Sequence, residues 1–228
     1  MSHNPYKGGN CVKKRATGAA CVLMVALAAG SALAADQTYV TARAGVFLPN
    51  GRDGGDYKGF KYFDTGYDLD IAVGYRPEPY AALELGTGFY TASGTVNRPN
   101  FVQDRTAYGV PVTLNAKGIL EFEKLMLSAG AGVGLYQGFM ENKINFTTGG
   151  ISPVNETNHG TALGYQVVVD ADLKLTENWA VGANFKWFTA KPEIEMKNIN
   201  STETDVQTTK DKWEFGGTFV NVGVKYSF

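Results

Sequence analysis

Two short motifs place acidic residues two positions apart, Asp68-Leu69-Asp70 and Asp170-Ala171-Asp172. If each motif lies on a β-strand, both of its carboxylates point to the same side, because side chains alternate along a strand with period two. Carboxylates held together in this way can act as a general acid and base when a cleft brings a substrate to them. They can also serve as the anionic half of an ion-pair network.

Charged residues of both signs share the polar side of the segments around these motifs. The set holds five cations and five carboxylates: Arg43, Lys117, Lys174, Lys186 and Lys225, with Asp68, Asp70, Glu84, Asp170 and Asp172. In a narrow interior such charges must pair, because an unpaired one costs several kcal/mol. The pattern leaves two hypotheses open. The network fills the interior as a salt-bridged plug, or it lines a gated polar path and sets its selectivity.

Enzymatic chemistry has little support in the sequence. A hydrolase or acyltransferase needs a base that activates a hydroxyl. After position 34 the only histidine is His159, and neither Ser128 nor Ser152 stands in a recognisable pairing with it. No metal-ligand cluster, phosphate-binding loop or nucleophile elbow occurs. We therefore expect no catalytic residues, no cofactor and no metal, and a protein that is not an enzyme.

The elements that must position the charges are strands. Apolar and polar residues alternate strictly in eight segments, whereas a helix would need apolar spacings of three and four. The segments are 38–48, 65–75, 81–90, 108–117, 127–136, 163–174, 179–188 and 220–228. The fold class is therefore predicted to be all-β and antiparallel.

The connections alternate between short and long. Tight turns are expected at 76–79, 121–124 and 176–178, and long polar loops at 49–64, 91–105, 140–158 and 190–212. This is typical of an eight-stranded transmembrane β-barrel with periplasmic turns and extracellular loops. Alternation persists at 140–148 and 193–200, which predicts hairpins that protrude above the membrane. A further hairpin in these loops would raise the strand number to ten, and this alternative stays open.

A soluble sandwich or lipocalin-like barrel would also alternate. Its polar side would face water and carry large charged residues, whereas here that side is rich in Gly, Ser, Ala and Asn. Small inward residues suit the interior of an eight-stranded barrel, so the apolar side is predicted to face lipid. Two aromatic girdles are expected on the outer surface. Their members are Tyr75, Trp179, Tyr226 and Phe228 on the turn side, and Phe47, Tyr67, Phe89, Tyr108 and Trp187 on the loop side.

Residues 1–34 have the pattern of a cleaved signal peptide, which leaves a barrel domain of residues 35–228. Lys7, Lys13, Lys14 and Arg15 precede an apolar run that ends in Ala32-Leu33-Ala34. Both cysteines, Cys11 and Cys21, belong to this segment, so no disulfide is expected. It also holds four of the 21 basic and none of the 22 acidic residues, which leaves 17 minus 22, or −5. That charge argues against nucleic-acid binding.

Three stretches resemble a known family. They are VPVTLNAKG (Val110 to Gly118), LSAGAGVGLY (Leu127 to Tyr136) and the terminal Tyr226-x-Phe228. They are similar to the small eight-stranded outer-membrane β-barrel proteins of Gram-negative bacteria, the porin-like or opacity-like group that includes OmpX and the membrane domain of outer-membrane protein A.

The resemblance implies export to the bacterial outer membrane. It implies that the barrel-assembly machinery recognises Val224, Tyr226 and Phe228, and that the chain is a monomer in contact with lipid and lipopolysaccharide. The expected role is non-enzymatic, in envelope structure or in adhesion through the extracellular loops to a host or surface ligand. The alternative is a small porin-like channel for ions or small hydrophobic solutes. Loop cations at Lys58, Lys61, Arg98 and Lys191 either neutralise lipopolysaccharide phosphates or are simply solvated.

Overall fold

The computed structural model describes residues 37–50, 63–99, 101–146, 154–199, 206–212 and 215–228. The expected signal peptide, Lys58 and Lys61 lie outside these residues. Within the described residues ten strands are formed. They are β1 (Thr38–Pro49), β2 (Gly66–Glu78), β3 (Ala81–Arg98), β4 (Phe101–Phe122), β5 (Leu125–Phe146), β6 (Val154–Lys174), β7 (Trp179–Ala190), β8 (Glu193–Ile199), β9 (Val206–Lys212) and β10 (Phe215–Ser227).

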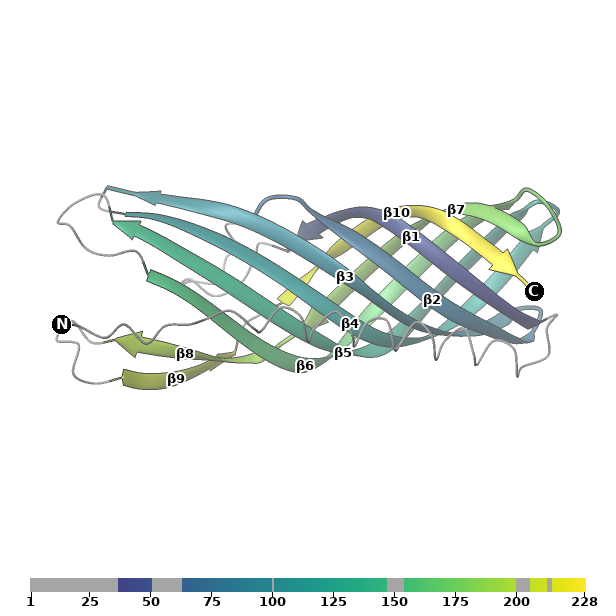
Figure 1. Cartoon of the computed structure of the whole chain (residues 1–228). Helices are drawn as coiled ribbons and strands as arrows, with labels where there is room; N and C mark the ends of the chain where they lie inside the picture. Colours follow the sequence, from purple (N-terminus) through teal and green to yellow (C-terminus); the bar gives the residue numbers. More distant parts are fainter. Residues whose placement is uncertain (1–36, 51–62, 100, 147–153, 200–205, 213–214) are drawn as a thin grey trace, which may run out of the picture.

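Eight of the ten strands close into one antiparallel barrel, in the order β1-β10-β7-β6-β5-β4-β3-β2 (Figure 1). The ring is closed between the first and last strands, which pair from Tyr39–Ser227 to Pro49–Gly217. Closure matters in lipid because an open sheet edge would leave backbone N–H and C=O groups without partners. The eight-stranded prediction is confirmed for the barrel. The two remaining strands, β8 and β9, form a hairpin of their own and do not enlarge it.

Short turns gather at one end of the barrel, beside the C-terminus (Figure 1). They join β2 to β3, β4 to β5 and β6 to β7, as the sequence predicts. The β4–β5 turn is Glu123-Lys124, and Glu123 has a φ of 44°. A residue without glycine's freedom adopts this left-handed conformation only where the tight connection requires it.

At the other end the strands reach further than predicted. Residues 91–105 were expected to form a loop, but β3 and β4 continue pairing up to Arg98–Phe101. The prediction was wrong because polar residues on one side of a strand, such as the exposed Ser93 and Thr95, do not mean a loop. On the other side of the same strand Ala92 and Val96 are buried. The protruding β5–β6 hairpin is confirmed, with pairing out to Ile144–Val154. The second protruding hairpin is β8–β9.

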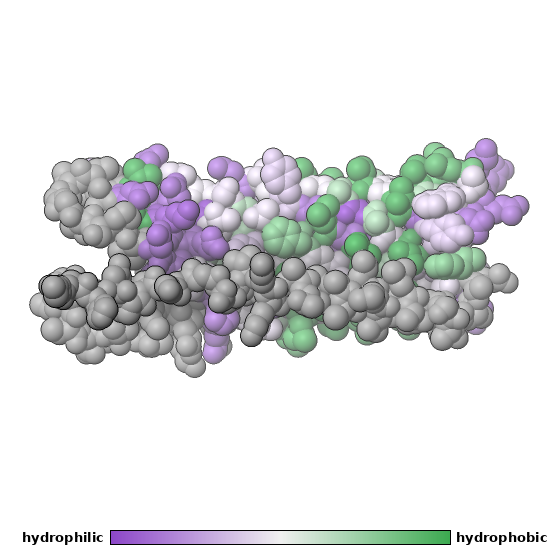
Figure 2. Space-filling model, viewed as in Figure 1, coloured by the Kyte–Doolittle hydropathy of each residue, from purple (hydrophilic) through white to green (hydrophobic). Residues whose placement is uncertain are grey.

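Large apolar side chains cover the outside of the barrel at membrane level. Figure 2 shows them as a band that lies between more hydrophilic ends. The most exposed include Tyr67, Leu69, Leu163 and Val222, between 59% and 74% accessible. In a soluble protein such a surface would be hidden, whereas lipid is a good solvent for it. No helix within the described residues is long and apolar enough to cross a membrane.

The aromatic girdles are formed in part. On the turn side, Trp179 and Tyr226 pack edge to face with ring centroids 4.9 Å apart, and Tyr226 packs against Phe228 at 5.2 Å. On the loop side, Phe89 lies 6.3 Å from Tyr108. Phe47, however, was wrongly assigned to the outer surface. Its side chain is fully buried inside the barrel, because it has the opposite parity to its outward neighbours Val46 and Leu48.

Candidate functional site

The barrel interior is the first candidate site, because it holds nearly all the charged residues singled out from the sequence. Nine of the ten are buried there, each at most 7% exposed: Arg43, Asp68, Asp70, Glu84, Lys117, Asp170, Asp172, Lys186 and Lys225. Parity explains the arrangement. Each occupies an inward position of its strand, and closure of the ring turns all inward positions toward one axis.

Asp170 is the centre of the ionic network. It accepts hydrogen bonds from Lys117 (2.9 Å), Ser128 (3.0 Å) and Asn184 (2.8 Å), and Arg43 lies 3.1 Å away. These contacts join β6 to strands on every side of the ring. A buried carboxylate with this many partners is well compensated for its lost hydration.

Glu84 and Asp70 extend the network through Lys117 and Arg43, the cations that they share with Asp170. Lys117 donates to Glu84 at 2.7 Å, and Arg43 donates to Asp70 at 3.2 Å. Lys186 also donates to Asp70. Each cation or carboxylate of this group therefore meets at least one opposite charge, as a salt-bridged filling requires.

Nearer the turn side, Lys225 pairs with Asp172 and lies over the ring of Tyr39, 5.0 Å from its centroid. Below this pair, Tyr39, Ala82, Ile119 and Met126 form a small apolar cluster. The cluster closes the floor of the barrel.

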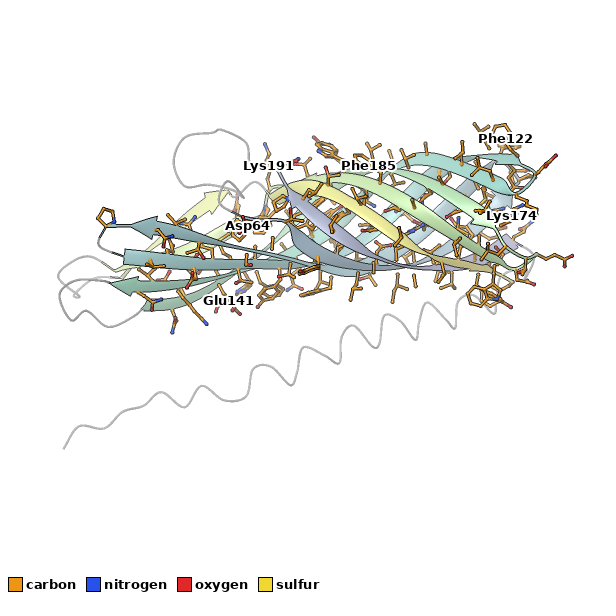
Figure 3. All side chains as sticks on the ribbon, turned by 90° about the horizontal axis from the view of Figure 1, so that it is seen from above. Asp64, Phe122, Glu141, Lys174, Phe185 and Lys191 are labelled. Carbon is orange, nitrogen blue, oxygen red and sulfur yellow. The ribbon has the colours of Figure 1, made fainter. Side chains whose placement is uncertain are left out.

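Lys174 is the one member of the predicted interior charges that does not lie inside the barrel. It lies at the turn-side end of the barrel, where Figure 3 labels it. Its ammonium group forms a salt bridge with the Glu121 carboxylate at 3.2 Å. Arg76 joins the same carboxylate at 2.9 Å. All three side chains are partly exposed, so this is a rim cluster in contact with water. The alternation of 163–174 assigned Lys174 to the inward side correctly, but the strand ends there and the side chain lies outside the enclosed interior.

The loop-side half of the interior is filled by aromatic rings, which sequence reasoning did not predict. We call this group the aromatic plug: Phe47, Tyr90, Tyr136, Phe188 and Phe219. Phe188 is its centre, stacked on Tyr136 at 4.9 Å with 7° between planes and on Phe219 at 5.0 Å with 6°. All five rings occupy inward positions, which is the signal that could have identified them.

Glycines on neighbouring strands make room for the plug. The ring of Tyr90 covers Gly109, and a Cβ at Gly109 would overlap it. The ring of Tyr136 lies in the same way against Gly164. The glycine-rich inward side thus accommodates large rings as well as charges. Within the described residues, the apolar floor, the ionic network and the aromatic plug follow one another through the interior.

The second candidate site is the sheet that projects beyond the plug. Strands β3 to β6 continue outward there as a four-stranded sheet, and β6 pairs with β7 no further than Gly164–Ala190. Beyond Gly138, β5 runs eight more residues, about 27 Å along the strand. Exposed polar residues such as Asp104, Lys143 and Asn155 cover it.

Comparison with known families decides what kind of protein carries these features. Residues 17–228 match the family model described as outer membrane protein beta-barrel domain. The chain belongs to this family. It is therefore an outer-membrane β-barrel protein, located in the bacterial outer membrane. No curated protein sequence matches it.

Several solved structures are similar to this chain. Pseudomonas aeruginosa OprG is similar with 12% identity and a TM-score of 0.51, over 85% of this chain and 97% of that one. Neisserial surface protein A is 16% identical, with a TM-score of 0.49 over 84% and 97%. The Escherichia coli outer membrane protease OmpT is 10% identical, with a TM-score of 0.49 over 85% and 97%. At 12% identity, the similarity to OprG indicates a common fold and leaves the activity open.

The outer-membrane barrel shows little that resembles a catalytic centre. His159 lies exposed on β6, where its ring is 6.3 Å from that of Phe139. Among the described residues, no group of three or more His, Cys, Asp and Glu side chains could hold a metal ion. The carboxylates of the two acidic motifs face cations and amides inside the barrel.

Proposed function

We propose that this outer-membrane barrel is a non-enzymatic surface-interaction protein. The barrel serves as a closed anchor and the projecting sheet of β3 to β6 is the working part. The observation that carries the proposal is the length of these hairpins beyond the aromatic plug. A protein that only filled space in the membrane would not need ordered strands that far outside it.

The interior supports the same assignment and argues against the alternative of a small channel. Conduction needs a continuous path that ions or solutes can occupy and leave. Here a buried ion-pair network, a ring cluster and an apolar floor follow one another along the axis. Moving this many bonded charges aside for each passage would cost several kcal/mol per unpaired ion.

The partner class that best fits the projecting sheet is an extended polypeptide on a host or neighbouring surface. The outer edge of β6 from Val154 to Leu163 forms no hydrogen-bonded ladder with another strand of the described residues, although β8 lies against part of β6. Such an edge offers backbone N–H and C=O groups to an added strand. The exposed Lys191 is a candidate contact for lipopolysaccharide phosphate at the same level. The described chain closes its own barrel, so we expect a monomer.

The experiment compares attachment by cells that display the intact barrel and a trimmed one. Joining Ser93 to Thr106 and Phe139 to His159 through Asn-Gly turns removes both long hairpins at paired positions. We expect cells with the intact protein to be retained on a cultured epithelial monolayer, and cells with the trimmed barrel to fall to the level of the empty vector.

The control keeps the hairpins and alters the interior. Glu84→Gln with Lys117→Met removes one charge of each sign from a bonded pair. We expect this variant to retain attachment. A heat-shifted gel band shows that the trimmed barrel has folded. If the folded trimmed barrel attached as well as the intact one, the proposal would be wrong.

A further inference from the structure

The wall of the barrel has a local defect between β3 and β4. The two strands pair at Thr87–Val112 and again at Tyr90–Gly109 in the same register, but the two pairs between them are not formed. Pro111 lies in this gap. Proline has no backbone N–H, so the carbonyl of Gly88 opposite receives no donor from β4. The carbonyl of Pro111 itself accepts the Thr87 hydroxyl at 2.8 Å.

A cavity lies directly behind the defect, between the ionic network and the aromatic plug. Gly88 and Pro111 line it on the wall side, and Asp68, Tyr90 and Lys186 line it on the interior side. Its free space is about that of one water molecule. A backbone carbonyl without a partner is costly at membrane depth, and Gly88 itself lines this cavity.

Two buried side chains also present atoms without partners. Within the described residues, Asp68 Oδ1 and the Tyr90 hydroxyl have no hydrogen-bond partner, although the residues are only 5% and 2% exposed. The other oxygen of Asp68 accepts from Asn221 at 3.2 Å. Unsatisfied buried polar groups are rare in native proteins and call for an explanation, such as a bound ion or water.

The charges below the plug do not balance. The described interior holds five carboxylates there, Asp68, Asp70, Glu84, Asp170 and Asp172, against the four cations Arg43, Lys117, Lys186 and Lys225. Lys186 is bonded to Asp70. Arg105, a fifth buried cation, lies beyond the plug and donates to Gln103. Asp68 is thus the one carboxylate of this described set without a salt bridge.

We propose that the cavity is a binding site for one small monovalent cation, of the size of sodium or ammonium. The unused Asp68 oxygen supplies the charge, and the Gly88 carbonyl and Tyr90 hydroxyl supply neutral oxygen ligands. All three oxygens can coordinate a metal cation or accept a hydrogen bond from ammonium. The negative charge of Asp68 is the one that needs a counter-charge. A single carboxylate among neutral oxygens suits a monovalent ion, whereas protein sites for divalent ions gather several carboxylates.

Binding is tested through stability, since a ligand that binds only the folded barrel raises its unfolding midpoint. The protein, refolded into zwitterionic micelles, is unfolded in urea at fixed pH and ionic strength while choline chloride is replaced by sodium or ammonium chloride. Choline is too large for the cavity. We expect the midpoint to rise with sodium or ammonium and to saturate. In Asp68→Asn we expect the apparent affinity to weaken at least about tenfold.

Asp172→Asn is the matched control, because Asp172 is equally buried but bonded to Lys225. It should lower stability and leave the cation dependence in place. Equal midpoints for the wild type in all three salts would overturn the proposal. Midpoints that depend on pH alone would overturn it as well, because a bound proton would then neutralise the Asp68 carboxylate in place of a cation. The titratable and charged groups that face Asp68 are Asp70, Lys186, Arg43, Tyr90 and Tyr136.

A second measurement does not depend on the variant's folding. Crystals of the wild-type barrel soaked in thallium(I), a monovalent substitute, should show an anomalous peak beside Asp68 Oδ1. A water-like peak without anomalous signal at that position would equally contradict the cation site.

Discussion

Arg43 on β1 and Asp170 on β6 meet at 3.1 Å across the interior, although β10 and β7 separate their strands in the ring. Their side chains are 5% and 1% exposed. The pair therefore braces opposite walls, and Asp170 ties the same contact to Lys117 and Asn184.

Asp170→Asn should destabilise the barrel strongly. The substitution leaves Arg43 and Lys117 with one fewer counter-charge in an enclosed interior, at a cost of about 3 kcal/mol. The measurement is the urea midpoint of the refolded protein. Lys174→Gln is the control, since its bond to Glu121 is at the wet rim and contributes under about 1 kcal/mol. Similar losses for both variants would contradict an interior held by its ion pairs.

Phe188→Ala should open a cavity in the aromatic plug. Phe188 is fully buried and stacked on both Tyr136 and Phe219, so we expect a loss of about 3 kcal/mol in unfolding free energy. Phe185→Ala is the matched control on the same strand, because that ring points outward and is half exposed, as Figure 3 shows. Lipid tails can fill the space that it leaves. A larger loss of unfolding free energy for Phe185→Ala than for Phe188→Ala would contradict a stabilising role of the aromatic plug.

Glycine substitutions on β4 test whether the Tyr90 ring needs a residue without a side chain beside it. At Gly109 an added Cβ would overlap the Tyr90 ring, whereas at Gly118 the nearest atom is 3.9 Å away. Gly109→Ala should therefore cost about 1 to 3 kcal/mol. Gly118→Ala should be neutral or slightly stabilising, because alanine loses less backbone entropy. The same urea titration decides, and equal effects would show that Tyr90 moves aside freely.

Phe228 is predicted to carry the signal for assembly, together with Val224 and Tyr226. Phe228→Ala should lower the amount of heat-shifted protein in outer-membrane fractions several-fold, without changing its urea midpoint after refolding. Val222→Ala is the control, since Val222 is also outward on β10 and is 69% exposed. Normal outer-membrane levels of Phe228→Ala would argue against the terminal signal.

The sequence predicted the strands and their lipid-facing side because alternation is a local property. Leu83 and Leu85 are outward and Glu84 between them is inward, as expected. The prediction for Phe47 was wrong because we gave the preference of aromatic residues for the membrane interface more weight than the parity of its position. The plug was missed for a different reason. Tyr90 and Phe188 lie on the inward side, which we expected to carry small residues.

Contacts across the barrel could not be predicted in detail. The charges that would be inward follow from parity, but the pairing of Arg43 with Asp170 depends on the stagger of all eight strands. Strand ends were also beyond local reasoning. The segment 91–105 carries polar residues such as Ser93 and Thr95 on its exposed side, and composition alone does not separate such a hairpin from a loop.

Single-channel conductance of the refolded barrel in a planar bilayer tests the central claim of a closed anchor most directly. With insertion verified by the heat-shifted band, we predict no discrete current steps in the wild type. Phe188→Ala with Phe219→Ala, which thins the plug, should remain silent too because the ionic network below still closes the axis. Discrete steps in the wild type that change with Glu84→Gln would contradict the account and make the interior charges a gate.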